Sequence, residues 1–156
     1  MNQSIVDHLN RELATAQILL LNTKRYHWMV VSPHFRDYHL RFEELYRAVE
    51  PMVDELGERI RMLEGIPIHT PEQISAASAV APSDPEVSLD AQAMLSEALD
   101  SEERVIDLMH SGIEKASKAK DPGTADLLTR FVQVHEMQAW FLRSARVLEP
   151  AVQGLV

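Results

Sequence analysis

Two histidines and two carboxylic acids are spaced as the ligands of a metal site would be. His27 and His39 lie twelve residues apart, and Asp54 and Glu58 follow His39 by fifteen and nineteen residues. Residues four apart share one face of a helix, so Asp54 and Glu58 would present neighbouring carboxylates. Two imidazoles with two carboxylates suit Fe(II), and they also accept zinc or manganese. These four residues are therefore candidate metal ligands and candidate catalytic residues.

One chain cannot bring all four side chains to the same ion. If His39 and Asp54 share a helix, fifteen residues at 1.5 Å each place them ~22 Å apart. A common site would need two subunits that meet antiparallel, with the histidines of one facing the carboxylates of the other. The alternative is that Asp54 and Glu58 belong to a solvated acidic face and that the two histidines are ordinary helix-end residues.

Apolar residues recur every three or four positions, which predicts long helices that would position these ligands. Proline and glycine divide the chain into four such segments, at about 5–30, 35–64, 86–118 and 124–148. The first would be capped by Ser4 or Asp7. Between the second and third segments the pattern lapses for about twenty residues. There, residues 70–73 have the form of a capping box with a proline at the first helical position, which predicts a short helix near 71–78.

Four long helices with one long crossover describe a ferritin-like four-helix bundle, an all-α fold with a single domain at 1–156. A helix of ~30 residues is ~45 Å long, and the crossover is long enough to return along it and join two parallel neighbours. The alternative is a plain up-and-down bundle or a helical interaction module with no site. Di-iron sites inside such bundles use Glu-x-x-His motifs, and this sequence has none. Asp107 and His110 come nearest and are interpreted as helix surface.

Composition excludes several classes of protein. Of 156 residues, 46% are hydrophobic and 25% charged, which is typical of a globular domain and excludes intrinsic disorder. The formal net charge of −9 disfavours nucleic acid as the default partner. The chain has no cysteine, so any metal must be bound by His, Asp and Glu. No apolar run is long enough to cross a bilayer and no signal peptide is visible, so we expect a cytoplasmic protein.

Several short stretches of sequence lie around the four candidate ligands and further along the chain. They are Tyr26-His27-Trp28, Pro33-His34-Phe35, Phe42-Glu43-Glu44-Leu45-Tyr46, Val53-Asp54-Glu55, Glu58-Arg59-Ile60, Thr124-Ala125-Asp126-Leu127-Leu128 and Trp140-Phe141-Leu142. Together they resemble the signature of the Dps family, the mini-ferritins of starved and peroxide-stressed bacteria. The resemblance extends over nearly the whole chain.

The resemblance implies a hollow homo-dodecamer with ferroxidase centres at two-fold interfaces between subunits. His27 and His39 would come from one subunit, and Asp54 and Glu58 from its partner. Fe(II) would be oxidised there by hydrogen peroxide or dioxygen, and the Fe(III) product stored as a mineral in the cavity, which protects the cell from oxidative damage. Zinc could substitute for iron in the site, since ligands of these types also accept it.

The resemblance also points to three further residues. Asp126 matches acidic residues that line three-fold pores in the family, and Asp121 is a second pore candidate. The alternative for both is capping of the last helix and a favourable interaction with its dipole. Trp28, beside His27, matches an interface aromatic residue that would act as a radical trap by intercepting stray oxidant. The alternative for Trp28 is packing at the interface.

The alternative function is that of a nucleoid-binding structural protein with direct DNA binding. Some family members bind DNA through a mobile Lys-rich tail, whereas here residues 1–23 contain one basic residue, Arg11, and residues 149–156 contain none. Direct DNA binding is therefore not expected. The lysines at positions 115, 118 and 120 are interpreted as the C-terminal end of a helix. No role follows from the sequence for His8, His69 or His135.

Overall fold

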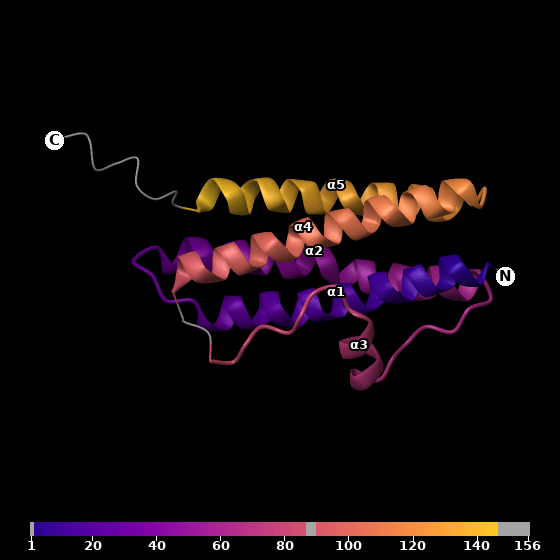
Figure 1. The fold of residues 1–156 in the computed structure, drawn as a ribbon. Coiled ribbons are helices and arrows are strands. Elements are labelled where there is room, and N and C mark those ends of the chain that lie inside the picture. Colours follow the sequence, from indigo (N-terminus) through magenta and orange to yellow (C-terminus); the bar gives the residue numbers. More distant parts are fainter. Residues whose placement is uncertain (1, 87–89, 147–156) are drawn as a thin grey trace.

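The structure is a computed structural model that describes residues 2–86 and 90–146. Its long helices are α1 (Gln3–Met29), α2 (Phe35–Met62), α4 (Ala91–Lys118) and α5 (Pro122–Ala145), and a short helix α3 (Pro71–Ala77) lies in the crossover. The long helices lie side by side, and each short connection joins antiparallel neighbours (Figure 1). The predicted all-α, ferritin-like four-helix bundle is thus confirmed. None of the helices described is long and apolar enough to cross a membrane.

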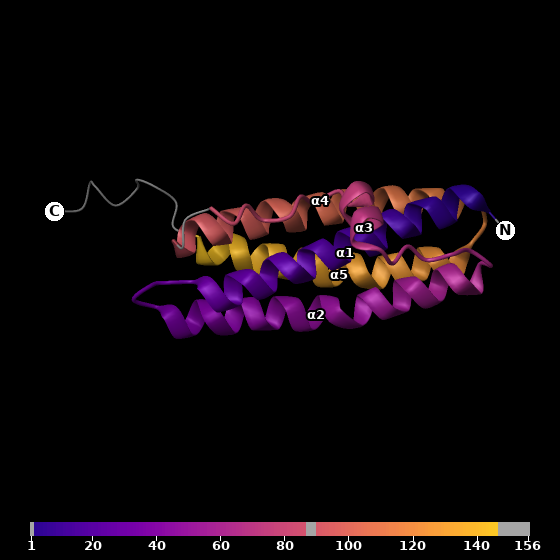
Figure 2. The same cartoon turned by 90° about the horizontal axis from the view of Figure 1, so that it is seen from below.

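The crossover is held along the outside of α1 by polar side chains of that helix (Figure 2). Asn10 donates to the carbonyl of Ile66 at 3.1 Å and accepts from the N–H of Ile68 at 2.9 Å. Further along α1, the Thr15 hydroxyl accepts from a backbone N–H of the crossover, and Asn22 both donates and accepts. Because α1 supplies these partners, the long connection has a fixed path and lets α2 and α4 run parallel.

The short helix α3 confirms a prediction made from four residues. The side chain of Thr70 accepts a hydrogen bond from the N–H of Gln73, and the Gln73 side chain accepts one from the N–H of Thr70. Pro71 occupies the first helical position, where its missing N–H costs nothing. The complete capping box fixes the start of α3 within the crossover.

Two helix starts differ from the prediction. α1 begins after Asn2, whose side chain makes no capping hydrogen bond, so the prediction of Ser4 or Asp7 as the cap is wrong. Asp7 instead accepts a hydrogen bond from the side chain of Gln3, inside the helix. α4 begins at Ala91, later than predicted, because Asp90 caps it. Residues 87–89, which the prediction placed in this helix, lie outside the described residues.

The last helix starts slightly earlier than predicted. Asp121 caps α5 by accepting from the N–H of Thr124, so Pro122 rather than Thr124 begins the helix. The helix ends at Ala145 in the described part of the chain. The predicted end near Leu148 and the stop at Pro150 lie outside the described residues.

Apolar side chains form two clusters along the bundle, one around Leu56 and Phe131 and the other around Phe42 and Leu95. Buried polar residues of α4 and α5 lie between the two clusters, and two buried polar residues of α1 are considered with them. We call this set the core polar cluster: His8 and Glu12 of α1, Glu102 of α4, and His135 and Gln138 of α5.

Candidate metal centre

The turn between α1 and α2 brings His27 and His39 together. His27 lies near the end of α1 and His39 in the first turns of α2. Their rings stack with centroids 3.7 Å apart and an interplanar angle of 21°. The antiparallel pairing of the two helices therefore places two imidazoles, twelve residues apart in sequence, at one position on the surface of the bundle.

Reciprocal hydrogen bonds fix the orientation of both rings. Nδ1 of His27 lies 2.8 Å from the carbonyl oxygen of His39, and Nδ1 of His39 lies 2.7 Å from the carbonyl oxygen of His27. A carbonyl only accepts, so each Nδ1 carries the proton and donates it. Each Nε2 is thereby left with a free lone pair. Metal-binding histidines are prepared in this way, because the second ring nitrogen is held by a carbonyl or a carboxylate.

Glu43 completes a group of three donors that the sequence analysis did not assign. Ligand atoms of His27, His39 and Glu43 lie within 4.8 Å of one another, and across residues 2–86 and 90–146 no other group of three such side chains meets this distance. All three are partly buried. Glu43 lies one turn beyond His39, so the spacing of four residues was available in the sequence as a signal. The adjacent Glu44 is more exposed and pairs with Arg41.

Aromatic side chains frame the histidine pair. Phe35 stacks on His39 with ring centroids 5.0 Å apart, and Tyr46 meets His27 edge-on at 5.4 Å. Arg47 forms an ion pair with Glu43. The two rings are therefore flanked by aromatic side chains, and the carboxylate beside them is paired with Arg47.

Asp54 and Glu58 lie elsewhere, on the exposed side of the second half of α2. They line an open groove of about 770 Å³ together with Val53, Gly57 and Met62. The helix is continuous from Phe35 to Met62, so the ~22 Å expected between His39 and Asp54 applies in the folded chain. Within one subunit the structure brings the histidines together and brings the carboxylates together, but it keeps the two pairs apart.

Large apolar side chains are exposed beside both pairs. Trp28 is 69% exposed and Val31 64% exposed next to the histidines. Met62 is 68% exposed and Ile66 79% exposed near Glu58. Apolar patches of this kind are typical of protein–protein contact surfaces.

The two pore candidates differ in what they contact. Asp121 caps α5 and forms an ion pair with Arg59 at 2.7 Å. Burial favours the neutral acid, but hydrogen bonds from Thr124 and the charge of Arg59 outweigh burial and lower the pKa of Asp121. The capping alternative therefore describes Asp121. Asp126 is exposed and lines two shallow grooves at the start of α5.

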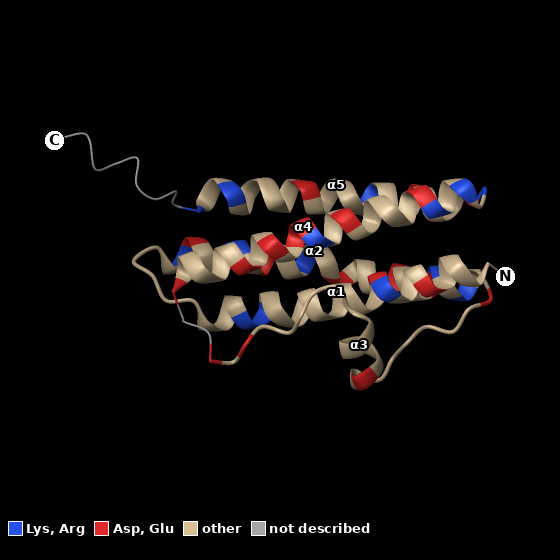
Figure 3. Cartoon of the chain, viewed as in Figure 1, with Lys and Arg blue, Asp and Glu red and all other residues tan. Residues whose placement is uncertain are grey.

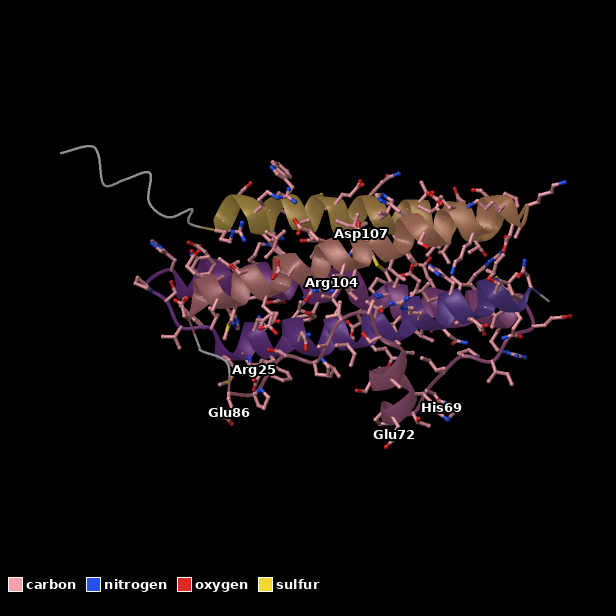
Figure 4. All side chains as sticks on the ribbon, in the orientation of Figure 1. Arg25, His69, Glu72, Glu86, Arg104 and Asp107 are labelled. Carbon is pink, nitrogen blue, oxygen red and sulfur yellow. The ribbon has the colours of Figure 1, made fainter. Side chains whose placement is uncertain are left out.

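The remaining surface histidines take no part in this centre. His110 lies 3.7 Å from Glu136, and both side chains are exposed. Asp107 is exposed on α4, in keeping with the interpretation of this pair as helix surface. His69 projects from the crossover, away from the bundle (Figure 4).

Comparison with known proteins assigns the chain to a family. The chain matches the family model of the ferritin-like domain over residues 6–148. It is 40% identical to Dps from Thermosynechococcus elongatus, with 96% of this chain and 95% of that chain covered and a TM-score of 0.89. It is 30% identical to DNA protection during starvation protein 1 of Deinococcus radiodurans, over 91% of this chain and 68% of that protein. The chain belongs to the Dps family.

The chain is also similar to a second Dps structure, which links it to a wider superfamily. The Dps protein of Vibrio cholerae is described as a member of a superfamily of ferritin-like diiron-carboxylate proteins. It is 27% identical to this chain, with 91% of this chain and 88% of that chain covered and a TM-score of 0.86. Membership in the Dps family supports an iron-related role of the mini-ferritin type and confirms the family resemblance of the sequence.

Proposed function

We propose that this Dps protein oxidises Fe(II) at centres shared between two subunits and stores the Fe(III) product inside a hollow dodecamer. One observation carries the proposal. The paired His27 and His39 bond through Nδ1 to backbone carbonyls, and with Glu43 they form a group of three donor side chains, while the carboxylates of Asp54 and Glu58 lie too far along α2 to join them in the same chain. An antiparallel partner would supply the missing carboxylates.

The donor set suits the chemistry. Imidazole nitrogen and carboxylate oxygen atoms bind Fe(II), and the negative charge of the carboxylates stabilises Fe(III) further. Two Fe(II) ions each give up one electron, and the two electrons break the O–O bond of one hydrogen peroxide molecule to give two hydroxide ions. No hydroxyl radical leaves the site when both electrons are delivered together. Dioxygen is the alternative oxidant, and zinc would occupy the same ligands without being oxidised.

The remaining residues take roles around this reaction. Asp126 would line the path by which Fe(II) enters, since it is exposed and lies at the start of α5. Trp28 would intercept stray oxidant at the interface, because it adjoins His27 and is largely exposed in the single chain. A cytoplasmic, bacterial location is part of the proposal.

Direct DNA binding is not part of the proposed function. Acidic and basic side chains are interspersed along α4 and α5 (Figure 3). Several basic residues there form ion pairs, among them Arg130 with Glu55 and Arg143 with Glu103. A surface of this kind offers few unpaired cations for phosphate contacts.

A subunit-mixing experiment tests the shared centre. His39→Ala and Asp54→Ala should each abolish the protein-dependent oxidation of Fe(II) by hydrogen peroxide, measured by absorbance in anaerobic stopped flow. When the two variants are unfolded together and reassembled, half of the two-fold pairs are mixed. Each mixed pair contains one intact centre of two, so activity should return to about a quarter of the wild-type value.

The controls make this result specific. Each variant reassembled alone should remain inactive, and His69→Ala, which changes a histidine outside the bundle, should retain full activity. Size-exclusion chromatography should show the same oligomer in every case. The proposal is wrong if mixing restores nothing while the mixed oligomers form, or if either single variant oxidises Fe(II) at the wild-type rate.

A further inference from the structure

Gly57, in α2, is not explained by the packing of its own chain. A Cβ added at Gly65, Gly112 or Gly123 would come within 2.6, 2.6 and 2.9 Å of a side-chain atom, so close packing accounts for these three glycines. A Cβ at Gly57 would meet nothing within 4 Å. No glycine of the described residues has a positive φ, and glycine is less favourable than alanine inside a helix. The missing side chain at Gly57 therefore calls for a reason outside the single chain.

Gly57 belongs to the open groove on α2 that also contains the two candidate carboxylate ligands. It lies between Asp54 and Glu58 in the sequence, and all three line the groove of about 770 Å³. Leu13 and Met62 add apolar surface to the same groove. Because position 57 has no side chain, a side chain of another molecule can approach the backbone of the helix between the two acids.

The hydrogen bonds of the histidine pair set the register of α1 against α2. Each Nδ1 bonds to the carbonyl oxygen of the other residue, so His27 and His39 lie level with each other. The two helices are antiparallel (Figure 1), so Trp28, one residue further along α1, lies level with Tyr38, one residue earlier in α2. Trp28 is 69% exposed, so the largest side chain beside the metal centre is mostly unpacked in the single chain.

The shared centre of the proposed function sets a register between two subunits as well. His39 would face a point midway between the partner's Asp54 and the partner's Glu58, which is position 56. The two α2 helices would run antiparallel, so the level one residue before His39 would face the partner's Gly57. Trp28 lies at that level. The register therefore brings the exposed indole of each subunit opposite the groove of the other.

Charge and hydrophobicity agree with this register. The same antiparallel alignment places Arg47, whose side chain is 68% exposed, within one helical turn of the partner's Glu50. It places the exposed Met62 near the partner's turn between α1 and α2, where Val31 and Phe35 are exposed. Opposite charges meet near the middle of α2 and apolar side chains meet toward its ends, as in a complementary interface.

We propose that Trp28 of each subunit packs over Gly57 of its partner, and that the missing side chain at Gly57 sets how closely the two halves of the shared centre approach. Tryptophan is enriched among the residues that dominate interface energetics, and an aromatic side chain buries about 150–250 Å². A buried indole N–H needs an acceptor, and the groove supplies carboxylates, among them Glu50. Gly57 is thus a positioning residue. The inference rests on the proposed function for the pairing of the subunits, but the contact itself contains no metal.

The fluorescence of Trp28 tests the contact in metal-free protein. The chain has two tryptophans, so Trp140→Phe leaves Trp28 as the only one. In the assembled protein, Trp28 should emit at the shorter wavelengths of a buried indole and be quenched less by acrylamide than in protein unfolded in urea. Gly57→Leu should shift this emission to longer wavelengths and weaken subunit association at least tenfold. Its helix content by circular dichroism should be retained, because a Cβ at this position meets nothing in its own chain.

A size exchange across the interface separates the contact from folding. Subunits with Gly57→Leu overfill the contact when they pair with their own kind, and subunits with Trp28→Ala leave it empty. A mixed two-fold pair contains one native contact and one in which the leucine occupies the space of the missing indole. Mass spectrometry of cross-linked pairs after reassembly should therefore find more mixed pairs than the half expected by chance.

The matched control is Ser111→Leu, which adds the same side chain at an exposed position of α4 and should leave the emission of Trp28 unchanged. Mixed pairs at one half or less would overturn the proposal, as would an emission of Trp28 that Gly57→Leu does not shift. Iron is absent from every measurement. Protein that shows the Trp28 contact but does not oxidise Fe(II) would therefore refute only the proposed function, and the reverse result would refute only this inference.

Discussion

Histidine and glutamate side chains lie close together in two regions of this Dps protein. The two regions differ in which polar atoms are left without hydrogen-bond partners. At the surface, His27 and His39 each donate from Nδ1 to the other's backbone carbonyl, and both lie within donor distance of Glu43. In the core, His135 is bound directly to a carboxylate, and oxygen atoms rather than nitrogen atoms are in excess. The same residue types thus form an open half-site in one place and an enclosed cluster in the other. Hydrogen-bond partners and burial, rather than residue type, decide whether an open half-site or an enclosed cluster forms.

The largest expected difference between the regions is in stability. His135→Ala leaves Glu102 as an unpaired charge in the core, and breaking a buried pair costs about 3–5 kcal/mol. His27→Ala removes a half-buried side chain whose neighbours remain solvated, and we expect a loss of about 1 kcal/mol. Urea unfolding followed by circular dichroism, at one fixed protein concentration and with a chelator present, measures both. Similar losses in the two variants would show that the core pair is not electrostatically distinct from the surface pair.

A second comparison separates two adjacent acids within the surface region. Glu43→Gln removes a carboxylate that shares the space of His27 and His39, and we expect Fe(II) oxidation to slow about tenfold, which is typical for loss of one supporting group. Glu44→Gln changes the neighbouring acid, which is exposed and pairs with Arg41, so the rate should stay unchanged. Initial rates with hydrogen peroxide at limiting Fe(II) provide the measurement. Equal rates in both variants would remove Glu43 from the centre.

The sequence predicted those features that depend on residues close together along the chain. The helices follow from an apolar repeat of three to four residues, and the capping box at Thr70 is contained in four positions. Glu43 was missed because it is adjacent to Glu44 in the sequence. The two acids could not be distinguished until the side of α2 that faces His27 was known. The core polar cluster was missed for a stronger reason. Its members come from α1, α4 and α5, and only packing brings Glu12 near His135.

The smallest expected effect compares two acids at the start of α5. Asp121→Ala removes a helix cap and the ion pair with Arg59, which should cost about 1–2 kcal/mol at pH 7. Because folding lowers the pKa of Asp121, this stabilisation is complete above the usual value of 3.8 and is lost as the pH falls through the lower, folded pKa. Asp126→Ala, at an exposed position, should change stability by less than about 0.5 kcal/mol at any pH. Thermal midpoints from pH 7 down to pH 3 test both, and a gap between wild type and Asp121→Ala that widens toward low pH would contradict the assignment of Asp121 as an ionised cap.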